Sequence, residues 1–123
     1  MDRKIKISTL NGGQEFEMPK RKTKHRKMLY EKMAELEKEK PEMFPDRKYR
    51  QLMEGAYLAL FIIQDVQPKA TIDDILSLSD DIEDEDNILK VTCLAWGSDY
   101  NEIKKELKSG VENFPKGKNP QNT

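Results

Sequence analysis

The chain has 123 residues, of which 36% are apolar and 37% charged, so its length suits one domain with a modest core. The charged fraction is well above the roughly 25% that is usual for globular proteins. The net charge of −1 conceals an asymmetry, because residues 1–50 carry 15 Lys and Arg against 9 Asp and Glu, whereas residues 51–123 carry 7 against 14. The two halves either neutralise each other within the fold or attract each other between copies.

The residue inventory argues against an enzyme. Cys93 is the single cysteine, which excludes an intrachain disulfide and is typical of a reducing cytosol. Its apolar neighbours predict a core position. His25 is the only histidine, so no Ser-His-acid set and no Cys/His metal site is recognisable. The acidic run 80–86 lacks the Gly and Glu spacing of a calcium-binding EF-hand loop. We therefore expect no catalytic, metal-binding or cofactor-binding residues.

The N-terminal segment predicts a β-hairpin over residues 3–18. Apolar and polar residues alternate in both strands. The alternation places Ile5 and Ile7 on one face of the first strand, and Phe16 and Met18 on one face of the second. An Asn-Gly-Gly turn separates the two strands, because Asn and Gly tolerate positive φ angles. A lone hairpin is barely stable in water. This hairpin must therefore pack on the helices or pair with strands of another copy.

Caps and apolar stripes predict a helical body of four to five helices. Thr23, Asp46 and Thr71 stand where N-caps are expected, and Asp74 completes a variant capping box with Thr71. The second helix has the strongest apolar stripe and should be the centre of the core. The helices are expected at about 23–40, 47–66, 71–78, 84–96 and 98–109.

These elements give an α+β fold class, in which a mainly α-helical domain carries an N-terminal β-hairpin. The single domain covers residues 1–110, with the hairpin at 3–18 and the helical body at 23–109. Residues 111–123 are expected to be a disordered tail, because they have few apolar residues and no periodicity. The N-terminus has no secretory pattern, and the longest apolar stretch, 56–63, is too short to span a bilayer. A soluble intracellular protein is expected.

Residues 20–27, the basic segment, gather six Lys or Arg residues and His25. Cations near a helix N-terminus are unfavourable, so a compensating negative charge is expected. It could come from a nucleic acid, from the acidic run 80–86 of the same chain, or from that run in a neighbouring copy. No aromatic residue is interleaved before Tyr30, and the acidic remainder of the chain would repel phosphate. Contact with an acidic protein surface is therefore favoured over nucleic acid.

The order of the elements resembles the tail assembly chaperones of long-tailed, siphovirus-like phages and prophages. The strand pair "KIKISTLNGGQEFEM" comes first, and the junction "PKRKT" at 19–23 leads into the first helix. A helical body and a short polar C-terminal tail follow. The resemblance covers most of residues 4–109 and rests on this order rather than on one invariant motif.

The resemblance implies a non-catalytic role in the cytoplasm of the host cell. Such chaperones coat the long, aggregation-prone tape measure protein while the tail tube polymerises around it, and they are absent from the finished virion. Many relatives also make a longer product by a −1 ribosomal frameshift near the end of the gene, and Gly117-Lys118-Asn119 is compatible with the slippery heptamer A AAA AAC. The tape measure protein is the expected partner, with the tail tube protein, the longer product and further copies of the chain as additional partners. Neither a membrane nor a nucleic acid is expected.

A chaperone for a helical client can offer an apolar groove to amphipathic segments. The six methionines suit an adaptable binding surface, although they can equally fill a small core. The candidate protein-binding residues are apolar (Leu29, Met33, Tyr57 and Phe61) or charged (Lys20, Arg21, Lys24, Asp81, Asp84 and Asp86). Each has an alternative interpretation as a core residue or part of a solvated face. Two alternative functions also stand: a small nucleic-acid-binding regulator that uses residues 20–27, and a structural head–tail protein of the virion.

Overall fold

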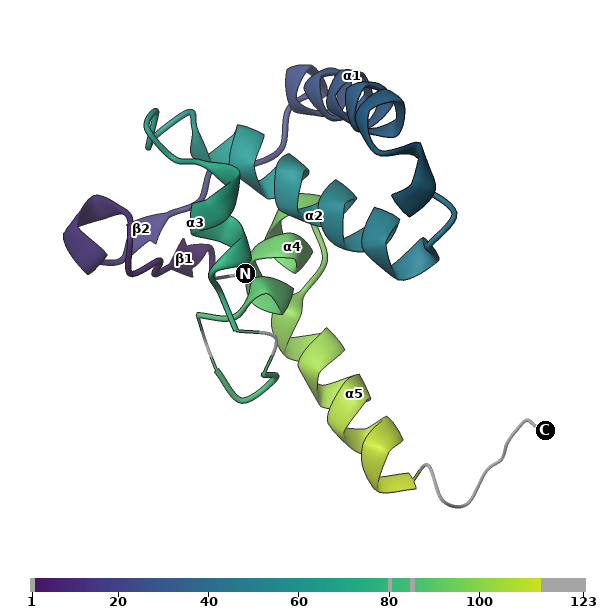
Figure 1. Ribbon diagram of the computed structural model, residues 1–123. Coiled ribbons are helices and arrows are strands. Elements are labelled where there is room, and N and C mark those ends of the chain that lie inside the picture. The colour runs from purple at the N-terminus through teal and green to yellow at the C-terminus, as the bar shows by residue number, and fades with distance from the viewer. Residues whose placement is uncertain (1, 80, 85, 114–123) are drawn as a thin grey trace.

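The computed structural model describes residues 2–79, 81–84 and 86–113, and for residues 107–113 it describes the backbone. The described residues form a two-stranded antiparallel hairpin followed by five α-helices (Figure 1). The predicted α+β class, mainly helical with an N-terminal hairpin, is confirmed. The elements are β1 Lys4–Ile5, η1 Asn11–Gly13, β2 Phe16–Glu17, α1 Thr23–Glu39, η2 Pro41–Met43, α2 Arg47–Ile63, α3 Ile72–Leu76, α4 Ile88–Trp96 and α5 Tyr100–Asn113.

The hairpin packs against the helices. Its strands pair over only two residues each, which is shorter than the alternation predicted. Ile5, Ile7 and Met18 are nevertheless fully buried and belong to the same apolar cluster as the helices. The turn at Asn11–Gly13 has positive φ at all three residues, as its composition predicts. Burial on the helices therefore stabilises a hairpin that would be marginal alone.

Helix α2 is the centre of the core, as its apolar stripe predicts. Asp46 caps it, because its Oδ1 accepts hydrogen bonds from the backbone N–H groups of Lys48 and Tyr49 at 2.9 and 3.2 Å. The helix packs against α1, α3 and α4 (Figure 1). Most of its residues from Met53 to Ile63 are buried.

At the N-terminal ends of α3 and α1, one predicted capping residue is confirmed and the other is wrong. Thr71 caps α3 as predicted: its N–H donates to Asp74 Oδ2 at 2.8 Å, and its Oγ1 accepts from the Asp74 N–H at 3.4 Å. The prediction that Thr23 caps α1 is wrong, because Thr23 is already the first helical residue and Lys22 occupies the N-cap position. The side chain that caps this end is His25, described below.

The last two helices differ from the prediction at their ends. The prediction that α4 begins near residue 84 is wrong: Asn87 is its N-cap, and its Oδ1 accepts from the Lys90 N–H at 3.0 Å. Gly97 ends α4 in the left-handed conformation, with φ of 80°. Helix α5 projects from the body and continues to Asn113 (Figure 1). The tail expected to be disordered from residue 111 thus begins within a helix, and residues 114–123 lie outside the described part of the chain.

Candidate protein-binding surface

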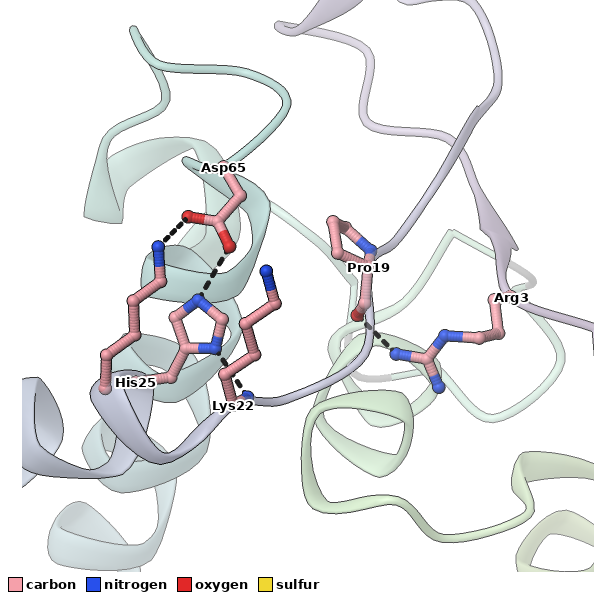
Figure 2. Close-up of polar contacts among 6 residues, drawn as sticks. Arg3, Pro19, Lys22, His25 and Asp65 are labelled. Atoms are coloured by element: carbon pink, nitrogen blue, oxygen red, sulfur yellow. Dashed lines mark hydrogen bonds and ion pairs between the residues drawn. The ribbon is translucent and has the colours of Figure 1, made fainter.

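The basic segment lies at the junction between the hairpin and α1. Residues 20–22 precede the helix, and the remaining cations lie in its first two turns. The hairpin holds the start of this junction, because the Arg3 guanidinium donates a hydrogen bond to the carbonyl oxygen of Pro19 (Figure 2). It also donates to the carbonyl oxygen of Met18. The segment is therefore anchored before α1 begins.

His25 joins the start of α1 to the end of α2. Its side chain is completely buried. Nδ1 accepts a hydrogen bond from the Lys22 backbone N–H at 2.8 Å, so the ring proton belongs on Nε2, which donates to Asp65 Oδ2 at 2.9 Å (Figure 2). Lys24 Nζ lies 3.1 Å from the other carboxylate oxygen of Asp65. The hydrogen bond from Lys24, followed by that from His25, holds the pKa of Asp65 below its usual value.

Asp65 thus places one negative charge beside the start of α1, where it pairs with Lys24. Within the described residues, no ion pair joins the basic segment to Asp81, Asp84 or Asp86. The acidic run of the same chain was one of three sources considered for this charge, and its described residues make no ion pair with the basic segment. His25 and Asp65 are 40 residues apart in sequence, and no local pattern could have paired them.

Arg21 covers the end of α4. Its guanidinium carbon lies 5.9 Å from the centroid of the Trp96 ring, and its Nη1 donates to the Trp96 carbonyl at 3.2 Å. A cation at this position suits the partial negative charge of a helix C-terminus. Arg26 contacts Tyr30 in a similar way, with a hydrogen bond of 2.7 Å to the phenol oxygen. Two of the six cations are therefore packed on aromatic side chains.

The acidic run forms a loop built from turns rather than the first turn of a helix. The carboxylate of Asp81 accepts from the Glu83 N–H, and that of Asp84 accepts from the Asp86 N–H, each at 2.9 Å. The fully buried side chain of Asn87 donates to the Asp81 carbonyl and caps α4 with its other end. This loop, residues 81–84 and 86–87 of the described chain, is called the acidic loop below.

An apolar groove of about 580 Å³ lies between α2 and α4. Its α2 wall consists of Lys48, Gln51, Leu52 and Gly55. Leu89, Thr92 and Trp96 form much of its α4 wall. Leu52 and Trp96 are 40% and 41% exposed. A Cβ atom on Gly55 would lie 2.9 Å from Thr92 Cγ2, so glycine allows the two helices to approach closely at the floor of this α2/α4 groove.

A second groove, of about 550 Å³, lies between α1 and α2 and is closed by η2. Tyr30, Met33 and Phe44 supply its apolar lining, and Glu37 and Arg50 are among its charged residues. It contains Met33, one of the four predicted apolar contacts.

The other predicted apolar contacts lie deeper in the fold. Leu29 and Tyr57 belong to the buried core, and half-buried Phe61 stacks on Tyr57 with ring centroids 5.9 Å apart. Leu52 belongs to the apolar stripe that predicted α2 as the centre of the core, yet its side chain is half-exposed. The exposure of Trp96 at the last turn of α4 was also missed. The sequence did contain one signal for this exposure: Trp96 directly precedes Gly97, which ends the helix. A side chain at the end of a helix has fewer neighbours to cover it.

No protein-family model, curated protein sequence or solved structure matches the chain. Within the described residues, none of the helices combines the length and apolar character needed to cross a bilayer. In the same part of the chain, no group of three or more His, Cys, Asp or Glu side chains could hold a metal ion.

Proposed function

We propose that the protein is a non-catalytic phage tail assembly chaperone that binds apolar segments of the tape measure protein. It acts in the cytoplasm of the host cell before the virion is complete. The tail tube protein is a second client. A longer frameshifted product would keep the same N-terminal fold and therefore the same binding surface.

The α2/α4 groove is the observation that carries this proposal. Exposed apolar side chains that line a common groove are typical of surfaces that bind an amphipathic helix. Tryptophan is also among the residues that contribute most to protein interfaces. Leu52 and Trp96 are both about 40% exposed on opposite walls of one groove. An amphipathic helix of a client could bury both side chains.

The order of the elements gives separate support. An N-terminal hairpin, a basic junction and a helical body occur here in the order that the phage chaperones have. The hairpin and the His25–Asp65 contact fix the basic junction beside the body. A client with acidic segments would therefore meet cations at one defined place.

Co-purification tests the proposal. The chain would be tagged and expressed with the tape measure protein, the very long helical protein that the proposal expects to be encoded downstream of this chain. The bound fraction would be measured after a high-salt wash. We expect a soluble complex, and expression of the long protein alone should give aggregates. Finding no complex, together with the chain in purified virions, would instead support a structural head–tail protein. Tight, salt-steep binding to a DNA or RNA duplex would instead support a regulator acting through residues 20–27.

A further inference from the structure

We propose that the α2/α4 groove binds one amphipathic α-helix of a partner, whose basic end meets the acidic loop and whose acidic end meets Arg21. The inference deepens the proposed function, on which it rests for the identity of the partner, by naming the class of segment and its charge pattern. The groove and the charged segments at its two ends are observed in the structure and do not depend on the identity of the partner.

The length of the groove fits about two turns of helix. Its α4 wall runs from Ile88 to Trp96, nine residues, which corresponds to about 12 Å along a helix axis. A partner helix with anchors at i, i+3 and i+7 spans about 10 Å. Three apolar side chains of the partner could therefore contact Leu52, Leu89 and Trp96 together.

The two ends of the groove border segments of opposite charge, the acidic loop at the start of α4 and Arg21 at its end. Ile82 lines it from within the acidic loop, between Asp81 and Glu83 in the chain. The other end is bounded by Trp96, on which the guanidinium of Arg21 is stacked. Such an arrangement selects a partner with complementary charges and fixes its register.

Lys48 also lines the groove, from α2. It does not cancel the charge of the loop, because Asp81, Asp84 and Asp86 together outnumber it. The loop is also held in a defined shape, since Asn87 bonds to the Asp81 carbonyl and caps α4. These two bonds connect the backbone at Asp81 to the start of α4.

The sequence provides a direct probe, because Trp96 is the only tryptophan. We would titrate the full chain with a synthetic helical peptide of about 16 residues that carries leucines at i, i+3 and i+7, lysines at one end and glutamates at the other. Binding should shift the Trp96 emission to shorter wavelength with a saturable curve. A peptide of the same composition in scrambled order is the control. No saturable shift, or an equal shift with the scrambled peptide, refutes the inference.

Two matched substitutions locate the site. Leu52→Asp places a charge in the groove, and Val66→Asp places the same charge at a residue of similar exposure, 47%, outside its lining. We expect Leu52→Asp to weaken binding at least about 10-fold and Val66→Asp to change it less than about twofold. The milder Leu52→Ala should weaken binding by an intermediate factor, and circular dichroism would check that each variant folds. Equal effects of Leu52→Asp and Val66→Asp refute the site.

Charge variants test which end of the partner helix lies beside the acidic loop. Asp81→Asn combined with Asp84→Asn should weaken the binding of the peptide that carries lysines at one end, by about three- to tenfold at low salt and much less at high salt. A peptide with glutamates at both ends should lose nothing from the same change. Equal losses for the two peptides would contradict the proposed charge pattern.

The outcomes separate this inference from the proposed function. If the tape measure protein co-purifies equally well with wild type and with Leu52→Asp, the chaperone role stands and the groove is not its site. If the peptide binds as expected but the tape measure protein does not co-purify, the helix-binding groove stands and the phage role fails.

Discussion

Substituting His25 tests whether one buried side chain holds α1 on the body. His25→Ala removes the hydrogen bonds to the Lys22 N–H and to Asp65 Oδ2, and it leaves a cavity where a fully buried ring was. A hydrogen bond between neutral groups contributes about 1 kcal/mol and one to a charged group about 1.5–3 kcal/mol. The lost packing of the ring adds to this. We expect the free energy of unfolding to fall by about 3.5–5 kcal/mol, a large share of the roughly 5–15 kcal/mol typical of a domain.

Two further variants separate the two bonds. Asn at position 25 offers an amide oxygen where Nδ1 lies and should keep the contact with Lys22. Gln offers an amide N–H where Nε2 lies and should keep the contact with Asp65. Each is expected to lose about half as much stability as His25→Ala, since each keeps one of the two bonds.

Urea unfolding followed by far-UV circular dichroism measures these differences. Adding Asp65→Ala to each variant then identifies the retained bond, because this second substitution costs more stability where position 25 still contacts Asp65. It should cost at least about 1 kcal/mol more in His25→Gln than in His25→Asn. If His25→Ala costs less than about 1 kcal/mol, the buried contact does not hold the helix and the reasoning is refuted.

Three other predictions concern stability. Gly55→Ala should destabilise by roughly 1 kcal/mol in urea unfolding, because the clash with Thr92 costs about 1–3 kcal/mol and exceeds the gain of about 1 kcal/mol in helix propensity. Asp65→Asn should lower the melting temperature at pH 7, and the difference should shrink as the pH falls below about 4. The lowered pKa of Asp65 means that its stabilisation is present above the unfolded pKa and is lost as the pH falls through the folded pKa. Asn87→Ala should cost about 2–3 kcal/mol in chemical denaturation, because it removes a helix cap and a buried hydrogen bond.

Controls follow from the same contacts. Thr92→Ser removes the atom nearest to a Cβ at position 55, so it should relieve much of the cost of Gly55→Ala. A stabilised Gly55→Ala variant in the wild-type background would contradict the close approach of α2 and α4. A constant difference between wild type and Asp65→Asn from pH 7 to pH 3 would contradict the role assigned to Asp65.

Local signals in the sequence predicted most of the fold. The positions of α1 and α2 follow from apolar stripes that recur at helical spacing, and Asp46 and Thr71 act as caps where their side chains and position predict. The hairpin was recognisable from its alternation and its turn. These features depend on neighbours within a few residues, which is why one sequence was sufficient.

The features that the sequence did not predict depend either on competing local hydrogen bonds or on contacts between residues far apart in the chain. The sequence predicted that a helix would begin near residue 84. Carboxylates can also accept hydrogen bonds from nearby backbone N–H groups, and in the acidic loop these bonds form instead of a first helical turn. Asn87, a good N-cap residue, was the stronger signal. The role of Asp65 and the exposure of Leu52 follow only from the packing of separate helices.

The anchoring of the basic segment has an entropic consequence. The short stretch 20–22 is tied to the hairpin at Pro19 by Arg3 and to α2 at Lys22 through His25 (Figure 2). Ordering a flexible backbone costs about 1–2 kcal/mol per residue. The backbone of this stretch is already ordered in the folded protein, so binding of a partner does not include this cost. An acidic surface that approaches these lysines needs to restrict only their side chains. Recognition of the segment should therefore be fast and sensitive to ionic strength, without a step in which the loop must first take shape.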